Sequence, residues 1–507
     1  MVRNLCHNKA LGATSNQLRW LLIGLDIQEN RMKRVRCFVV CFLVLGFPIC
    51  ALGDNNTRRQ DDALREKAES TLSKATSYFH GNLSVEGGYV YFYSLDTGVR
   101  WGEGQASAKQ VWVQPPGSPT VGLALLAAYE ATGNPDYLYQ AMDAADALVY
   151  GQLSSGGWQN QIDLGGIEKG NRYSGGKRRK EGFSSLDDGQ SQTAIRFMIR
   201  MDKALRFRDE EVHQSALLAL DSLLNAQFPI GAFPQGWRGP VEKHAVKKAS
   251  YPNYDWKTEN RVKNYWDMYT LNDNVCGHVA DTLVTAYNVY REEKYLKALK
   301  KLGDFLVLAQ MPEPQPGWAQ QYNYEMNPIW ARKFEPAAVA GDESQEVIET
   351  LLAIYQSTGD KKYLQPIPPA LAYLKRSLLK NGQLARYYEL KTNRPLYMER
   401  KGKVYSLTYD DSRLPAHYGW KWNSRIQQLE SSYESHLEGK ASAPHKVSYK
   451  KVREIIESLD SNGRWVTVHD GRKLVGQAKM KVGERYVSSK RFSQNVETLA
   501  TYLKQIR

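Results

Sequence analysis

Acidic and guanidinium side chains occur in loop segments where the packing of a core does not require them. The acidic ones, Asp187, Asp188 and Asp273, precede predicted helices, and the basic ones are Arg332, Arg386 and Arg400, with Trp330 close to Arg332. Paired carboxylates can act as acid and base on a glycosidic bond, and arginines bind carboxylates through paired hydrogen bonds. The simpler interpretation is that the aspartates cap helices and that the arginines are solvated.

The composition limits the class of partner. The chain has 507 residues, 42% of them hydrophobic and 24% charged, which excludes collagen, low-complexity disorder and a polytopic membrane protein. Lys and Arg number 68 against 54 Asp and Glu, a net charge of +14. This excess favours a polyanionic partner, which could be nucleic acid, anionic lipid or an acidic polysaccharide. No metalloprotease, serine hydrolase, P-loop or dinucleotide-binding motif is visible.

The N-terminus resembles an export signal. A basic segment from Met32 to Arg36 precedes an apolar run of 14 residues, Cys37–Cys50, and the small residues Ala51-Leu52-Gly53. The run is shorter than the ~20 residues that a membrane-spanning helix needs. We therefore predict that residues 1–53 form an N-terminal extension and signal peptide, and that the protein is exported to the periplasm or the medium. A buried strand or a short anchor is the alternative.

Cysteine usage agrees with export of a chain without disulfides. Four of the five cysteines lie within residues 1–53, so removal of that segment leaves Cys276 alone. A single cysteine can form neither an internal disulfide nor a thiolate metal site.

The elements that must position the candidate residues are predicted to be helices. Apolar residues recur with helical spacing in eight segments: 138–149, 190–205, 209–226, 273–289, 293–309, 343–356, 361–379 and 492–505. Alternating strand patterns are short, at Tyr89–Tyr93 and Trp465–Val468.

The helices repeat as hairpins. A glycine-aromatic or glycine-apolar turn follows the second helix of each pair, and the residues of these turns, Trp158, Phe233, Trp318 and Leu384, are 75, 85 and 66 residues apart. A hairpin with one apolar face must stack on its neighbours to bury that face. We therefore predict an all-α fold, an α/α toroid with few short strands, and an open helical solenoid is the alternative. The toroid is expected to span residues 54–424, and a helical extension, 425–507, is expected to pack on it.

Six segments in sequence order resemble one known family. Arg386-Tyr387-Tyr388-Glu389-Leu390-Lys391-Thr392-Asn393-Arg394-Pro395 resembles Arg-Phe-Tyr-Glu-Ile-Gly-Thr-Asn-Arg-Pro of the family-ten pectate lyases. The other five segments that resemble this family are 187–196, 228–235, 269–273, 328–336 and 341–344. The resemblance covers about residues 118 to 422.

The resemblance implies calcium-assisted β-elimination of polygalacturonate on an α/α toroid. It implies that Arg332 is the catalytic base and that Asp187 and Asp273 organise Ca²⁺. By the same analogy Arg386 and Arg400 bind substrate carboxylates, and Asp188 and Trp330 support substrate binding. Calcium with oxygen ligands can neutralise the carboxylate beside the reacting carbon. An arginine base is chemically demanding, because a free guanidinium has a pKa above about 12.

The chain also departs from the family pattern. Asp188 stands where the family has Asn, and residues 240–266 are interpreted as an insertion that forms a lid, extends the sugar-binding cleft or has no role in binding. The partner is expected to be an acidic polysaccharide, with no nucleic acid or membrane bound after removal of the signal, and the protein is expected to be a monomer. A non-catalytic binder of anionic glycans and an unrelated α/α-toroid hydrolase are the rival functions.

Overall fold

The computed structural model describes residues 55–165, 182–257, 261–440 and 446–507. The predicted signal peptide lies outside the described residues, and its prediction stays untested. Helices dominate the described part of the chain, and none of them is long and apolar enough to cross a membrane.

The helices form hairpins, each with an inner helix that packs against the inner helix of the next hairpin. The inner helices are α4 (Ser118–Thr132), α6 (Gln190–Ala204), α8 (Val275–Tyr290), α10 (Gly341–Thr358), α12 (Ile426–Leu437) and α14 (Ser489–Gln505). The outer helices are α5 (Pro135–Gly151), α7 (Glu210–Asn225), α9 (Glu293–Leu308) and α11 (Ile367–Arg376), and α3 (Asn55–Leu83) and α13 (Tyr449–Glu457) lie beside α14. The predicted all-α fold of an α/α toroid is confirmed.

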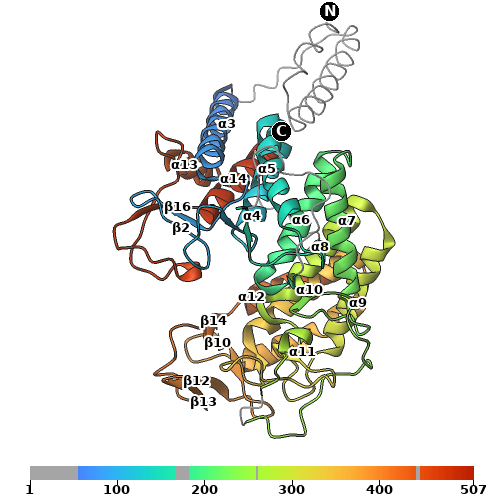
Figure 1. Ribbon diagram of the computed structural model, residues 1–507. Helices are drawn as coiled ribbons and strands as arrows, with labels where there is room; N and C mark the ends of the chain where they lie inside the picture. Colours follow the sequence, from blue (N-terminus) through green and yellow to red (C-terminus); the bar gives the residue numbers. More distant parts are fainter. Residues whose placement is uncertain (1–54, 166–181, 258–260, 441–445) are drawn as a thin grey trace, which may run out of the picture.

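Contacts between the inner helices run in the order α14, α4, α6, α8, α10 and α12 (Figure 1). The last helix of the chain therefore lies next to the first inner helix. Among the described elements, α12 and α14 make no extensive contact with each other, so the ring of inner helices is open between them.

Buried aromatic side chains fix the predicted turns onto the outer helices. Trp158 and Trp318 have no exposed surface, and their indole nitrogens donate to the carbonyl oxygens of Leu148 at 2.9 Å and Leu306 at 2.8 Å. A buried indole N–H needs such a partner. Because each turn is attached in the same way, equivalent residues of successive hairpins are brought to the same rim of the toroid.

Short antiparallel strands connect successive hairpins along this rim. The strands there are β3 (Gln110–Trp112), β4 (Gln161–Asp163), β5 (Ser184–Ser185), β6 (Gly236–Trp237), β7 (Tyr269–Thr270), β8 (Gln321–Tyr322), β9 (Val339–Ala340), β10 (Gln383–Ala385), β11 (Tyr387–Tyr388), β12 (Pro395–Lys401), β13 (Val404–Thr408) and β14 (Lys421–Asn423). β5 pairs with β6, β7 with β8, and β9 with β11. At the end of each pair a backbone N–H of the first segment donates to a carbonyl of the second, from Leu186 to Gln235, Leu271 to Gln320, and Gly341 to Arg386. Gln235, Gln320 and Arg386 thus hold equivalent rim positions.

One predicted helix is interrupted. The segment 361–379 forms a 3₁₀ turn, η4 (Lys361–Leu364), and then the shorter helix α11. Pro366, Pro368 and Pro369 stand at the break, and proline lacks the N–H that a continuous helix requires.

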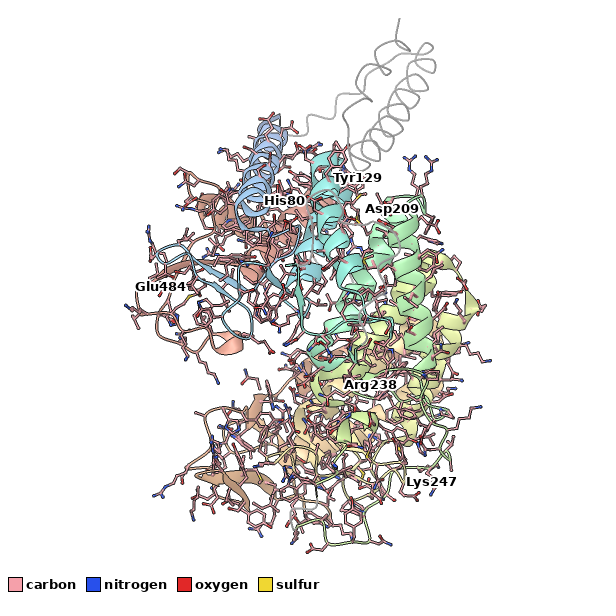
Figure 2. The ribbon with its side chains drawn as sticks, viewed as in Figure 1. His80, Tyr129, Asp209, Arg238, Lys247 and Glu484 are labelled. Atoms are coloured by element: carbon pink, nitrogen blue, oxygen red, sulfur yellow. The ribbon has the colours of Figure 1, made fainter. Side chains whose placement is uncertain are left out.

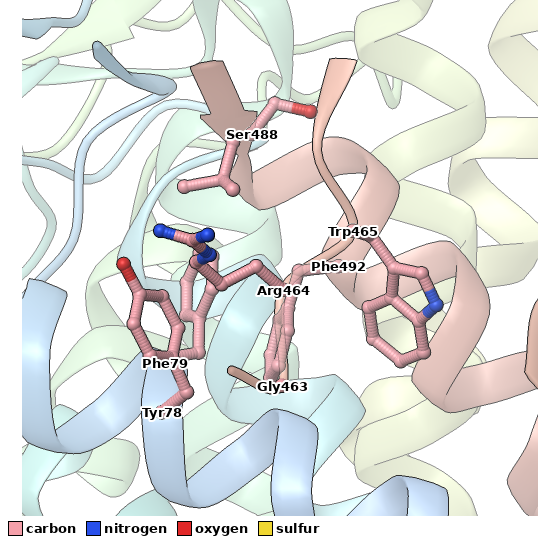
Figure 3. A pocket seen from close by; sticks show the side chains of 8 residues that line it. Tyr78, Phe79, Gly463, Arg464, Trp465, Ser488 and Phe492 are labelled. Atoms are coloured by element: carbon pink, nitrogen blue, oxygen red, sulfur yellow. The ribbon is translucent and has the colours of Figure 1, made fainter. Parts of the chain in front are cut away.

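The C-terminal extension repeats the hairpin design. Its strands β15 (Thr467–Val468) and β16 (Arg485–Ser488) form one sheet with β1 (Phe92–Ser94) and β2 (Arg100–Trp101). Trp465 donates to the Ile455 carbonyl at 3.0 Å, as the two earlier tryptophans do in their hairpins. Figure 3 shows Phe79 of α3 beside Phe492 of α14, and these rings stack with centroids 3.9 Å apart. The space that remains beside these rings is about 10 Å³, so this contact between α3 and the C-terminal extension is closely packed.

Candidate active site

The predicted acidic residues lie at the starts of two adjacent inner helices. Asp187 and Asp188 belong to a 3₁₀ turn, η1 (Asp187–Gly189), before α6, and Asp273 belongs to the equivalent turn η3 (Asn272–Asn274) before α8. The two turns contact each other. Asp188 and Asp273 adopt left-handed backbone conformations with φ of 47° and 53°. Aspartate and asparagine tolerate this region better than most residues do.

The three aspartates are not helix caps. The N-cap positions of α6 and α8 are Gly189 and Asn274, and no side chain provides a capping hydrogen bond at either of them. The capping interpretation is therefore wrong, and packing gives no reason for three carboxylates here.

Electrostatic repulsion acts on this acidic cluster, which we define as Asp187, Asp188 and Asp273. Burial, and then the charges of Asp188 and Asp187, raises the pKa of Asp273. Desolvation, and then the charges of Asp187 and Glu103, raises the pKa of Asp188 to about 6. Like charges held close together disfavour ionisation, so each of these two pKa values is raised partly by its acidic neighbours. The cluster therefore gains stability from any positive charge placed within it.

The donor chemistry of the acidic cluster fits calcium, which prefers carboxylate oxygens. Within the described ranges, however, no group of three or more His, Cys, Asp or Glu side chains is placed so that it could hold a metal ion. The acidic cluster could therefore supply only part of a Ca²⁺ shell, and the remaining oxygens would have to come from outside the protein, such as those of an anionic ligand.

Arg332 lies beside the acidic cluster and is held by Glu335. Its guanidinium Nη2 is 2.5 Å from Glu335 Oε1, and its backbone N–H donates to Glu335 Oε2 at 3.1 Å. Burial by itself lowers the pKa of Arg332, but the hydrogen bond and charge of Glu335 outweigh it, and the pKa is raised. Tyr418 donates to the same carboxylate at 2.8 Å. Arg332 is therefore protonated in this arrangement, and only the release of Glu335 would favour the neutral form that a base requires.

Arg386 is buried against the ring of the same tyrosine, Tyr418. Its guanidinium carbon lies 4.2 Å from the Tyr418 ring centroid, and Nη2 lies 3.4 Å from Glu343 and 3.5 Å from the Asn272 side-chain oxygen. Burial lowers the pKa of Arg386, but the charges of Tyr387, Glu343 and other acidic neighbours outweigh burial, and the pKa is raised. Only 6% of the residue is exposed, so Arg386 is a fixed positive charge facing the acidic cluster.

Two predicted residues lie at the margin of this group. Trp330 is 4% exposed, so its ring offers little surface to a sugar, and its role in substrate binding stays a prediction. Arg400 is exposed on β12 and donates to the Gly402 carbonyl at 2.8 Å. After desolvation, the charges of Arg400, Lys473 and Arg332 lower the pKa of His417, so Arg400 and Arg332 both act on this ring.

Four site residues were not predicted from the sequence. Gln235 donates to Asp187 at 2.6 Å, and Gln114 donates to Asp188 at 2.9 Å. Glu335 and Tyr418 are the others. The repeat could have identified Gln235, because it stands two residues after the aromatic of its turn, as Arg386 does after Leu384.

The fold and the site together define a helical toroid whose rim gathers carboxylates and guanidinium groups around a place for an anionic ligand. Residues 152–383 match the family described as pectic acid lyase. This match confirms the resemblance seen in the sequence and supports a lyase that acts on a polysaccharide.

Solved structures with similar folds include several carbohydrate-active enzymes. The family 10 polysaccharide lyase from Cellvibrio cellulosa is 19% identical over 62% of this chain and 95% of its own, with a TM-score of 0.44. The cellobiose 2-epimerase from Bacillus thermoamylovorans is 13% identical over 88% of this chain and 100% of its own, with a TM-score of 0.45. The GH76 α-mannanase from Bacteroides thetaiotaomicron is 10% identical over 89% of this chain and 99% of its own, with a TM-score of 0.41. No curated protein matches the chain.

Proposed function

We propose that the protein is an exported, calcium-dependent pectate lyase that cleaves polygalacturonate by β-elimination. The observation that carries this proposal is the convergence of the acidic cluster with Arg332 and Arg386 at one rim. The carboxylates suit a cation, the arginines suit an anionic sugar, and the pectic acid lyase match covers both helix starts.

The proposed reaction removes the proton on C5 of a uronate unit. The electrons of the C5–H bond form a double bond between C4 and C5, the C4–O4 bond breaks, and O4 leaves with a proton. Because negative charge develops on the C6 carboxylate, positive charge placed beside it lowers the barrier. Calcium bound to Asp187 and Asp273 would supply part of this charge, and Arg386 would supply another part from a fixed position.

Arg332 is the proposed base. Its side chain is 35% exposed, so a ligand can reach Arg332 while Glu335 still holds it. A uronate chain that displaces the contact with Glu335 would remove the main interaction that keeps Arg332 protonated. Asp188 and Arg400 remain proposed substrate contacts, from the acidic cluster and from the exposed strand β12.

The decisive experiment incubates the purified protein with polygalacturonate and follows the ultraviolet absorbance of an unsaturated uronate. We expect absorbance to grow with calcium and to stop when a chelator is added. Cleavage to saturated products would identify a hydrolase, and binding without cleavage would identify a non-catalytic glycan-binding protein.

A further inference from the structure

A cleft lies next to the candidate active site, and the two ends of the insertion 240–266 form part of its lining. It has a volume of about 440 Å³, within the usual range of small-ligand sites. We call it the side cleft. Its lining includes Phe183, Trp237, Arg238, Glu242, Trp266 and Asp267, all of them in described parts of the chain.

The insertion is fixed to the body of the protein at several points. Ala249 donates its backbone N–H to Leu308 at 2.8 Å, and the Tyr254 hydroxyl donates to the Pro328 carbonyl at 3.2 Å. The two ends of the insertion, at Glu242 and Trp266, both line the side cleft. The described ends of the insertion therefore form part of the wall of the cleft.

The wall between the side cleft and the acidic cluster is one residue thick. Pro234 and Gly236 line the cleft, whereas Gln235 between them points its side-chain amide to Asp187 at 2.6 Å. The backbone N–H of Gln235 donates to the Trp266 carbonyl at 3.0 Å. The side cleft and the acidic cluster are therefore neighbours that share Gln235 as a common boundary.

A second link between the side cleft and the candidate active site lies in η2 (Tyr265–Asp267). The rings of Tyr265 and Trp266 meet edge to face with centroids 5.3 Å apart. Trp266 belongs to the side cleft, and the pKa of Tyr265, which desolvation raises, is also affected by Arg332 and Asp187. These two rings thus connect the cleft with the active site.

The side cleft offers a sugar acid one guanidinium and one accessible aromatic ring, and it also carries two carboxylates. Trp266 is 37% exposed, so a ring face is accessible for packing against a pyranose. Arg238, labelled in Figure 2 near the loop-bearing end of the helices, is exposed, and its guanidinium lies 5.9 Å from the Phe183 ring centroid. A guanidinium can bind a carboxylate through two hydrogen bonds, and the carboxylates of Asp267 and Glu242 can accept bonds from sugar hydroxyls.

We propose that the side cleft is an additional subsite that binds one uronate unit of the polysaccharide, with Arg238 on its carboxylate and Trp266 on its ring. This inference rests on the proposed function for its substrate, but its binding is independent of catalysis. It predicts that the protein prefers chains long enough to occupy both the active site and the side cleft.

The test compares Arg238→Gln and Trp266→Ala with Lys248→Gln, a matched control. Lys248 is an exposed cation on the same insertion and does not line the cleft. Binding of galacturonate oligomers of increasing length is measured by calorimetry in chelator, and kcat/KM is measured with calcium. Loss of one charge-assisted contact should weaken binding of long oligomers about 10-fold and leave the shortest bound oligomer unaffected. The control should match the unmodified protein at every length.

The outcomes separate the two proposals. A length-dependent loss of binding without any turnover would support the subsite and contradict the lyase. Normal turnover, together with a change in oligomer binding that is either absent or equal at all lengths, would contradict the subsite. If no oligomer binds at all, both proposals fail. Thermal unfolding of each variant shows that the comparison is between folded proteins, and Arg238→Lys should recover part of the lost affinity.

Discussion

The Arg332 guanidinium lies 2.5 Å from the Glu335 carboxylate, which is itself almost completely buried. This pair places a candidate base beside the acidic cluster while holding it in its protonated form. The proposed chemistry therefore requires substrate to displace Glu335 as the partner of Arg332. Replacing Arg332 or Glu335 tests this requirement.

Replacing Arg332 should remove turnover without removing binding. A positioned base contributes about 10²- to 10⁴-fold to the rate, so Arg332→Ala should lower kcat by that factor and leave KM within a few-fold. The measurement is initial-rate kinetics on polygalacturonate with saturating calcium. Lys333→Ala, the exposed neighbouring cation, is the control and should retain activity. Normal cleavage by Arg332→Ala would refute the assignment of the base.

Replacing Glu335 should change the pH dependence. Glu335→Gln removes the negative charge that raises the pKa of Arg332, so the pH at which Arg332 loses its proton should fall. A nearby opposite charge shifts a pKa by about 1 to 3 units, and the rise of kcat/KM with pH should move to lower pH by about one unit. A profile that keeps its midpoint would show that Arg332 does not act through deprotonation.

The sequence predicted the hairpins and the acidic cluster because both have local or repeated signatures. Helical periodicity located the helices, and the recurring turn after Gly157 and Gly317 indicated that equivalent residues share one rim. The sequence showed Glu335 only as part of a motif, because its effect on the pKa of Arg332 depends on the burial of both groups. Gln114 and Tyr418 reach the site from distant segments, and no local pattern reports such contacts. The burial of Trp330 could not be predicted either, because an aromatic side chain in a loop can point to the core or to solvent.

Calcium should stabilise the fold more at high pH than at low pH. The pKa of Asp188 is raised to about 6 and that of Asp273 is also raised, whereas unfolded aspartate ionises near about 4. A carboxyl whose folded pKa is raised favours folding when protonated, so stability in chelator should fall as pH rises from about 4 to about 6. Bound calcium should reverse this loss, by about 2.7 kcal/mol at 100 times its Kd.

Thermal unfolding at pH 5 and pH 8, with calcium and with chelator, measures this effect. Asp273→Asn should weaken both the fall in chelator and the calcium response, because one of the repelling charges is gone. Equal calcium responses at the two pH values, or an unchanged response in Asp273→Asn, would remove this residue from the metal site.

Changing Gly231 to alanine should disrupt both stability and activity. Its φ is 102°, and an added Cβ would lie 1.9 Å from the Lys301 carbonyl oxygen, so the backbone must move. The turn that Gly231 opens leads to Gln235, which donates to Asp187, so a displaced turn should also raise the calcium requirement.

Gly133→Ala is the matched control for the backbone conformation. Gly133 also has a positive φ, 74°, but an added Cβ there meets no atom within 4 Å. Its cost should be the conformational one alone, about 1 kcal/mol, whereas Gly231→Ala should cost about 3 kcal/mol or more, since steric displacement adds to conformational strain of about 1 to 3 kcal/mol. Denaturant unfolding measures both, and calcium titration of activity should differ from the unmodified protein in Gly231→Ala alone. Equal losses of stability in the two variants would show that the carbonyl of Lys301 can yield, and that the turn does not fix the position of Gln235.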